Sequence, residues 1–249
     1  MIINSYDLFG LALKDYVKGE RYKLLIERDD GYSNHMNLDL YFSRYEEWPD
    51  YEKCVLEHVR GRVLDVGCGA GRHSLYLQDK GFDVVSIDLS LEVVKVAKDM
   101  GCLNVIVMDA RFLGFRYGSF NTILLLGNNF GIAGDVEDTV SMLRQLHDIG
   151  RDDTLVVTTC RDPTKTDNPA HLSYHERNRR LGLPIGLLKL RFKYKNMIGS
   201  WFKLLIVTPG EMRDICEKAS WNLQVIIEGE NGMYSAILTR KGIDGPAGI

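Results

Sequence analysis

Three glycines and one carboxylate mark the part of the sequence most suited to chemistry. Gly67, Gly69 and Gly71 alternate with small residues directly after Asp65, between a short apolar run and a helix-like segment at residues 72–80. Glycine lets a backbone approach a ligand closely, and the free N–H groups of a helix's first turn point toward that ligand. A strand, a glycine turn and a helix in this order predict a cradle for a cofactor.

Two further acids follow apolar runs. The run at residues 82–87 ends in Asp88, and the run at residues 104–108 ends in Asp109. A carboxylate is acceptor-only, and a ribose diol supplies two donors. We therefore expect Asp88 to bind a ribose, although an aspartate that only caps the next helix fits the same position. Asp109 either binds a ligand in the same way or is simply a loop aspartate.

The stretch Asp65-Val66-Gly67-Cys68-Gly69-Ala70-Gly71 resembles motif I of the class I S-adenosylmethionine-dependent methyltransferases. The third glycine comes one residue earlier than in the dinucleotide fingerprint G-x-G-x-x-G. The resemblance implies that S-adenosylmethionine (SAM) is the cofactor, with the glycines along its amino-acid half and Asp65 near its ammonium. It also implies that Asp109 accepts from the adenine amino group and that the next backbone N–H, of Ala110, reaches a ring nitrogen.

A second family position follows the apolar run at residues 120–126. Gly127-Asn128-Asn129-Phe130-Gly131 lies where the resembled family carries its motif IV, which implies contacts to the methionine part of SAM or to the methyl acceptor. A turn of residues that tolerate unusual dihedral angles gives the same pattern. The stretch departs from the N-P-P-Y motif of adenine- and glutamine-methylating enzymes, which argues against those acceptors.

The residues expected at the cofactor form one set, and no catalytic residue or metal ligand is assigned. They are Asp65, Gly67, Cys68, Gly69, Gly71, Arg72, Asp88, Leu89, Asp109, Ala110, Gly127, Asn128, Tyr41 and Arg44. Arg72 lies in a first helical turn, where a positive charge opposes the helix dipole by roughly 0.3–1 kcal/mol. We therefore expect either an acidic partner or the SAM carboxylate beside it.

Alternation of apolar runs and helical patterns over residues 61–160 predicts a doubly wound α/β sheet. The resemblance implies seven mostly parallel strands in the order 3-2-1-4-5-7-6, with the last two antiparallel. The expected strands are residues 63–66, 82–87, 104–108, 120–126, 154–160, 222–228 and 233–239. The helices expected between them are residues 72–80, 91–100, 135–149 and 208–219.

Residues 1–60 are predicted as a helical cap that precedes a SAM-binding domain at residues 61–240. Its helices are expected from a cap at Ser5 through Val17 towards Gly19, and at residues 38–47 and 50–59, with a polar turn at residues 27–32. Tyr41 and Tyr45 lie four apart and would share a helix face next to Arg44. They are expected either to cover the cofactor as a lid or to bury aromatic surface on the sheet.

An insertion at residues 161–207 interrupts this pattern. Residues 161–187 are polar and show no clear period, and residues 188–207 alternate as a β-hairpin. His171 and His175 lie four apart, but no third ligand accompanies them, so an active-site histidine is favoured over a metal. A basic patch between residues 176 and 195 predicts either contact with an anionic substrate or a solvated face; it consists of Arg177, Arg179, Arg180, Lys189, Arg191, Lys193 and Lys195.

Composition limits the partners. The net charge is −3, 45% of residues are hydrophobic and 26% are charged, so we expect a sizeable core and no overall field that recruits nucleic acid or membrane. Five scattered cysteines without a C-x-x-C pair predict a reducing, cytoplasmic setting. Asp7 interrupts the apolar N-terminus, so no signal peptide is expected, and the tail from Lys241 is expected to fray.

The function expected from these features is methyl transfer from SAM to a small-molecule acceptor by in-line displacement, in a monomer or a homodimer. An RNA methyltransferase that uses residues 176–195 is one alternative. A methyltransferase-fold protein that binds SAM without turnover is another. A nucleotide-cofactor oxidoreductase of the NAD type is the third, and the early third glycine argues against it.

Overall fold

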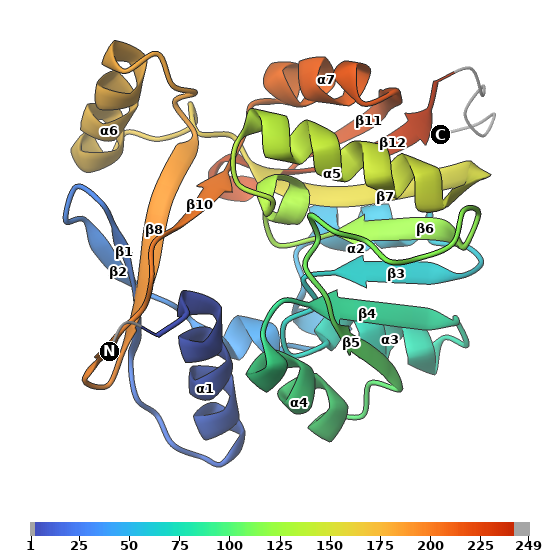
Figure 1. Ribbon diagram of the computed structural model, residues 1–249, viewed down its shortest axis with the longest axis horizontal. Coiled ribbons are helices and arrows are strands. Elements are labelled where there is room, and N and C mark those ends of the chain that lie inside the picture. The colour runs from blue at the N-terminus through green and yellow to red at the C-terminus, as the bar shows by residue number, and fades with distance from the viewer. Residues whose placement is uncertain (1–2, 242–249) are drawn as a thin grey trace.

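The computed structural model describes residues 3–241, which form two β-sheets and seven α-helices (Figure 1). The helices are α1 Ser5–Val17, α2 Asp50–Leu56, α3 Arg72–Asp79, α4 Leu91–Asp99, α5 Val136–Ile149, α6 Pro169–Arg180 and α7 Pro209–Lys218. The strands are β1 Leu24–Arg28, β2 Ser33–His35, β3 Val63–Val66, β4 Val84–Asp88, β5 Asn104–Val107, β6 Phe120–Leu125, β7 Gly150–Arg161, β8 Leu187–Tyr194, β9 Met197–Ile198, β10 Phe202–Leu205, β11 Trp221–Glu228 and β12 Met233–Arg240. The frayed tail expected beyond Lys241 lies outside the described residues.

The larger sheet has the strand order β11-β12-β7-β6-β3-β4-β5. Its strands β3 to β7 are parallel to one another, whereas β12 is antiparallel to β7 and β11 is antiparallel to β12. This is the predicted order 3-2-1-4-5-7-6, so the expected fold class is confirmed. The crossovers follow from the alternation of strands and helices along the chain, because a parallel neighbour needs a connection that returns over a sheet face.

Both faces of this sheet are covered, as a doubly wound sheet requires. Successive side chains of β6 alternate between two cores: Ile123 and Leu125 belong to the core that also holds residues of α5 and α7, while Leu124 packs in the core that holds residues of α2 and α3. All four residues of β3 are buried. Continuous apolar runs therefore predict these strands correctly, since each side chain meets a helix layer on one side or the other.

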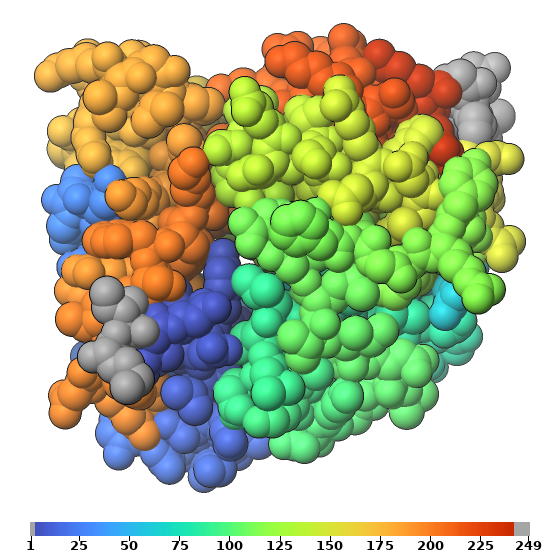
Figure 2. All heavy atoms as spheres, viewed as in Figure 1, coloured from blue at the N-terminus to red at the C-terminus, as the bar shows by residue number. Residues whose placement is uncertain are grey.

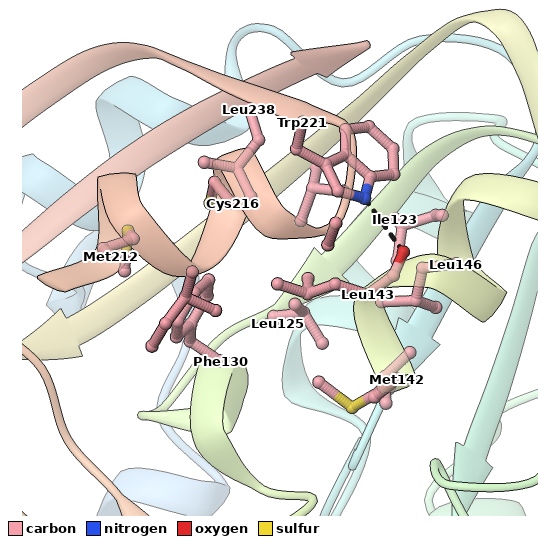
Figure 3. Packing of buried hydrophobic residues seen from close by; sticks show 14 of the residues in the cluster. Ile123, Leu125, Phe130, Met142, Leu143, Leu146, Met212, Cys216, Trp221 and Leu238 are labelled. Carbon is pink, nitrogen blue, oxygen red and sulfur yellow. Dashed lines mark hydrogen bonds between the residues drawn. The ribbon is translucent and has the colours of Figure 1, made fainter. Parts of the chain in front are cut away.

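Trp221 fills the centre of the core beneath α5 and α7 (Figure 3). It is fully buried, and its indole Nε1 donates to the Leu143 carbonyl oxygen at 2.9 Å. The edge of its ring also faces His147, with the two ring centroids 5.5 Å apart. The start of β11 is thus fixed to α5 by both packing and a hydrogen bond.

The smaller sheet has the order β10-β8-β1-β2, with the short β9 beside β8, and every pair is antiparallel. Its β8–β10 part confirms the predicted hairpin. The prediction that residues 1–60 are helical apart from one polar turn is correct for α1 and α2 but wrong for β1 and β2. These two strands form because β8 offers a second edge, along which Glu27 pairs with Arg191. Because the paired residues lie far apart in the sequence, no local hydrophobic period predicts these two strands.

Two other predictions are corrected. The helix expected at residues 38–47 is absent, and two short 3₁₀ turns, Leu38–Tyr41 and Tyr45–Glu47, take its place. The helical conformation is interrupted between these turns, because the buried Trp48 donates from its indole nitrogen to the Ser43 carbonyl at 3.1 Å. Conversely, α6 lies within the segment predicted to lack regular structure. Its start has a readable signal, since Asn168 caps the helix and Pro169 occupies the first turn.

The carboxyl ends of β3, β4 and β6 point toward the smaller sheet and α1 (Figure 1). The space-filling view shows the surface hollowed along the line where these parts meet (Figure 2). At one end of this line the two parts touch directly: a Cβ added to Gly131 would overlap the Leu205 carbonyl of β10. No helix within residues 3–241 is both long and apolar enough to cross a membrane.

We expect Trp221→Phe to lower the free energy of unfolding by about 2–3 kcal/mol, because it removes buried volume and one hydrogen bond. Trp201→Phe is the matched control, since Trp201 is 39% exposed; its effect should stay within about 0.5 kcal/mol. Denaturant unfolding followed by circular dichroism measures both. Equal effects of the two substitutions would contradict the central role of Trp221 in the core.

Candidate cofactor site

The turn between β3 and α3 has the open conformation that its glycines predict. Gly67, Gly69 and Gly71 have φ angles of +73°, +56° and +87°, in the region that side chains with a Cβ rarely adopt. A Cβ at Gly71 would overlap the Cys102 sulfur, and one at Gly69 would lie 3.2 Å from the Tyr41 ring. Cys68, which lies between Gly67 and Gly69, is buried, and burial raises the pKa of its thiol well above the usual range.

Asn129 braces this turn from the neighbouring strand end. Its amide Nδ2 donates to the carbonyl oxygens of Val66 at 2.8 Å and Gly67 at 3.0 Å. Both amide hydrogens are therefore used within the protein, so Asn129 positions the glycine turn. The sequence left open whether Asn129 contacts a ligand, and this arrangement assigns its donors elsewhere.

Asn128 differs from its neighbour. Its backbone has a φ of +71°, and its N–H donates to the Thr159 carbonyl of β7 at 3.1 Å, while Gly127 N–H donates to the Thr159 hydroxyl at 2.7 Å. Its side-chain Oδ1 is buried and has no hydrogen-bond partner among residues 3–241. An unpaired buried acceptor is costly, so a donor from a ligand would satisfy it.

Asp88 ends β4 beside the glycine turn. Its carboxylate accepts from the Gly69 N–H at 3.3 Å and from the Ser90 N–H at 3.1 Å. Burial raises the pKa of Asp88 to about 6, although these backbone hydrogen bonds act in the opposite direction. A carboxylate has about four acceptor positions, so capacity for a diol remains. Leu89, which follows it, is half-buried.

Asp65 lies beneath the turn and is 2% exposed. Its carboxylate accepts from the Ser74 hydroxyl at 2.6 Å, and that hydroxyl lies 2.7 Å from the hydroxyl of Ser86. Burial raises the pKa of Asp65, and His73 and the Ser74 hydrogen bond counteract part of that rise. In the structure Asp65 therefore joins β3 to α3, and its expected contact with an ammonium group stays a prediction.

Asp109 follows β5 and is bound by a residue of its own loop. The Arg111 guanidinium forms a two-pronged contact with it, at 3.0 Å and 2.6 Å, and this hydrogen bonding lowers the pKa of Asp109. The neighbouring Ala110 is half-buried against the main core. A base that bonds to Asp109 would therefore meet the Arg111 guanidinium as well.

Arg72 has an acidic partner, which is one of the two possibilities expected from the helix dipole. Its guanidinium lies 2.8 Å from the carboxylate of Glu52, and the same carboxylate lies 2.8 Å from His73 Nε2. Glu52 is only 4% exposed. Burial would raise its pKa, but His73 and Arg72 lower it below the ordinary value. The cluster fixes α2 against the first turn of α3.

The two predicted lid tyrosines lie apart, because the helix that was to carry both is absent. Tyr41 lies over Gly69 and its ring edge packs against Phe9, with centroids 4.9 Å apart. Burial raises the pKa of Tyr41 to about 12, and the Asp88 carboxylate adds to this rise. Tyr45 instead stacks on Tyr76 at 4.4 Å. Arg44 is exposed, and its backbone N–H donates to the Glu47 carboxylate at 2.8 Å, away from the glycine turn.

The basic patch is largely neutralised within the protein. All of its members except Lys189 form ion pairs with carboxylates of the described residues. Glu27 alone pairs with both Arg191 and Lys193, at 2.5 Å and 2.6 Å. The pairing favours the expected structural role over an anion-binding surface, because the charges are already compensated.

The two histidines of α6 lie near positive charge. Burial and the guanidiniums of Arg28 and Arg161 lower the pKa of His171, and burial and Arg179 lower that of His175. No group of three or more metal-ligating side chains occurs within residues 3–241. His171 contacts Tyr32 edge to face, with centroids 5.1 Å apart, and its Nδ1 lies 3.2 Å from the Thr166 hydroxyl.

Sequence reasoning missed three residues around the site. The Thr159 hydroxyl accepts from the Gly127 N–H, and Glu52 pairs with Arg72. Tyr6 of α1 precedes Asp7, whose carboxylate accepts from Ser90 beside Asp88. Each of these residues contacts a partner far away in the sequence, so no local spacing of residues predicts the contact. The sequence did predict that Arg72 needs a negative charge beside it, but it did not indicate that Glu52 supplies this charge.

Comparisons with known proteins agree with this geometry. A family model described as a methyltransferase domain matches residues 63–153. The matched region spans β3 to β6 and α3 to α5, so it includes the glycine turn, Asp88, Asp109 and Asn128.

Individual proteins similar to the chain carry related descriptions. The crystal structure of a SAM-dependent methyltransferase from Bacteroides fragilis, in complex with S-adenosylhomocysteine (SAH), superposes with a TM-score of 0.81 at 24% identity, covering 96% of this chain and 98% of that one. Glycine/sarcosine N-methyltransferase of Aphanothece halophytica is 31% identical over 112 residues, or 42% of each chain. Putative methyltransferase YqeM of Bacillus subtilis is 41% identical over 54 residues, or 22% of each.

These curated relatives match over less than half of their own length. The superposition on the Bacteroides fragilis structure, in contrast, extends the common fold over nearly the whole chain. The chain therefore shares the fold of that structure, including the region outside residues 63–153.

We expect Glu52→Gln to lower the free energy of unfolding by about 3 kcal/mol, because it leaves the guanidinium of Arg72 without a buried counter-charge. The difference from the wild type should shrink in acid. The pKa of Glu52 is lowered in the fold, so its contribution is present above the unfolded-state pKa and is lost as the pH falls through the folded-state pKa.

Denaturant unfolding at several pH values measures this effect. Asp50→Asn on the same helix is the control, since the Asp50 side chain is 97% exposed and its contact with Lys53 is 3.9 Å long. A Glu52→Gln protein as stable as the Asp50→Asn protein would contradict the role of the Glu52 cluster.

Proposed function

We propose that the protein is a SAM-dependent methyltransferase whose acceptor is a small molecule. The observation that carries the proposal is the meeting of the glycine turn with the Asp88 carboxylate, which touches the Gly69 N–H at 3.3 Å. In doubly wound sheets, ligands bind at the carboxyl ends of strands, where the strand order reverses. Here β3 lies between β4 and β6, so the glycine turn occupies that reversal point.

The residues present fit such a cofactor. Gly67, Gly69 and Gly71 leave the cradle free of side chains, and Asp88 retains acceptor capacity for a ribose diol. The buried, unpartnered Oδ1 of Asn128 offers an acceptor to an ammonium group at the end of β6. Asp65, Leu89, Asp109, Ala110, Gly127 and Tyr41 complete the proposed contacts, and Cys68 closes the turn from below.

Arg72 and Arg44 remain weaker members of the proposed set. The guanidinium of Arg72 is already paired with Glu52, and Arg44 is exposed. Their contribution to a carboxylate of the cofactor is therefore proposed as secondary. The backbone N–H groups at the start of α3 are better placed to meet negative charge.

When bound, SAM supplies an electrophilic methyl group. The protein's task is then to hold an acceptor in line with that methyl and to exclude water. The end of β6 and the smaller sheet face one another across the hollow in Figure 2, which supports this hollow as the acceptor side.

A small acceptor is favoured by two observations. The relative from Aphanothece halophytica is named for methylation of glycine and sarcosine. The basic patch of residues 176–195 is paired internally, which removes the main support for an RNA acceptor. The five cysteines are free, consistent with the reducing cytoplasm that we propose as the compartment.

The first test is calorimetric titration of the purified protein with SAM, SAH and NADH in parallel. We expect micromolar dissociation constants for SAM and SAH and no binding of NADH. Asp88→Ala should weaken SAH binding at least about tenfold, since it removes the charged acceptor for two ribose hydroxyls. Binding of NADH in place of SAH would overturn the proposal in favour of a nucleotide-dependent oxidoreductase.

A second prediction concerns pH. The pKa of Asp88 is raised to about 6, so the carboxylate that accepts from ribose is protonated increasingly below that pH. We expect SAH affinity to fall roughly tenfold between about pH 7.5 and pH 5, because only about a tenth of the carboxylate is ionised one unit below its pKa. In Asp88→Asn this pH dependence should vanish. An unchanged dependence in that variant would remove Asp88 from the ribose contact.

A further inference from the structure

The first turn of α1 is held between the two sheets. The Ser5 hydroxyl donates to the Ser200 carbonyl at 2.5 Å and accepts from the Phe192 N–H of β8 at 3.1 Å. Two residues later, the Asp7 carboxylate accepts from the Ser90 hydroxyl at 3.0 Å. Residues 5 and 7 therefore bind opposite walls of the hollow, and Tyr6 lies between them.

Close backbone packing keeps this turn over the end of β4. A Cβ added to Gly10 would lie 2.7 Å from Glu92 Cβ and 2.8 Å from the Val93 nitrogen, so α1 lies directly against the start of α4. Ser90, which caps α4, donates its own N–H to Asp88 at 3.1 Å. The same serine thus connects the turn of α1 to the proposed ribose acceptor.

Tyr6 has the surroundings of a ligand-facing residue. Its ring packs against Phe202 of β10, with centroids 5.0 Å apart, and its hydroxyl makes no hydrogen bond within residues 3–241. Burial raises the pKa of Tyr6 to about 12; the Arg111 guanidinium lowers it, and the carboxylates of Asp109 and Asp88 raise it. Tyr6 directly precedes Asp7, and the contact of Asp7 with Ser90 brings this turn of α1 beside Asp88, the proposed ribose acceptor.

We propose that Tyr6 closes the adenosine half of the cofactor site, with its ring against the nucleoside and its hydroxyl as an additional hydrogen-bonding group. This inference rests on the proposed function. Tyr6 of α1 would then cover the cofactor, a role that the sequence predicted only for the aromatic segment around Tyr41. Ser5, the residue before Tyr6, is hydrogen-bonded to the smaller sheet. The contact of Tyr6 with the nucleoside would therefore also hold the smaller sheet in place on the acceptor side.

The experiment compares two probes on the same variants: SAH, and 5′-methylthioadenosine, which keeps the nucleoside but lacks the amino acid. Tyr6→Ala should weaken both by the same factor, roughly tenfold, because aromatic packing and a hydrogen bond are lost from the shared half. Tyr6→Phe keeps the ring and its packing on Phe202, so it should lose only about threefold. Tyr117→Ala is the matched control, since Tyr117 is 70% exposed and remote.

The outcomes separate this inference from the proposed function. A wild-type protein that binds neither probe overturns both. A wild-type protein that binds SAH, with Tyr6→Ala and Tyr6→Phe binding both probes as tightly as Tyr117→Ala does, overturns the role of Tyr6 alone. Loss of SAH without loss of 5′-methylthioadenosine would place Tyr6 at the amino-acid half and also overturn it. Thermal melting of each variant shows whether it is folded, and Tyr6→Phe keeps the test decisive if Tyr6→Ala does not fold.

Discussion

A backbone turn with three positive φ angles presents its N–H groups to a ligand only if its neighbours hold it in that shape. Here the restraint comes from several directions. Asn129 binds the carbonyls of Val66 and Gly67, and the Asp88 carboxylate accepts from Gly69. Cys102 and Tyr41 pack where side chains at Gly71 and Gly69 would be. The parallel order β4-β3-β6 brings these braces to one edge of the sheet, so the site depends on the topology of the whole domain.

The smaller sheet completes this arrangement from segments far apart in the chain. Strand β1 comes from the region before β3 and β8 from the insertion after β7, and Glu27 joins them through Arg191 and Lys193. The sheet reaches the larger domain at the end of β10 and through Ser5 of α1. Transfer of a methyl group requires alignment and exclusion of water more than it requires acid–base groups. The smaller sheet lies opposite the strand ends, as the proposed methyl transfer requires. Its charged side chains Glu27, Arg191 and Lys193 pair with one another within the sheet.

The sequence predicts the centre of the large sheet well because β3, β4 and β6 are largely apolar and buried runs bounded by turn residues. The glycine turn, Asp88 and the capping box of Thr208 and Glu211 are likewise local patterns. The elements missed depend on distant partners. Strand β1 forms along the free edge of β8, and the break after Tyr41 follows from burial of Trp48. Glu52 and Tyr6 have no distinctive neighbours in sequence, and their importance lies in Arg72 and Asp88, which only the folded chain brings near them.

A crystal structure of the protein grown with SAH tests the central claim most directly. We expect both ribose hydroxyls to lie within hydrogen-bonding distance of the Asp88 carboxylate. We also expect the amino-acid half to run along the glycine turn toward Asn128, with the sulfur facing the smaller sheet. SAH bound elsewhere, or bound at the turn with the Asp88 carboxylate directed away from the ribose, would contradict the account.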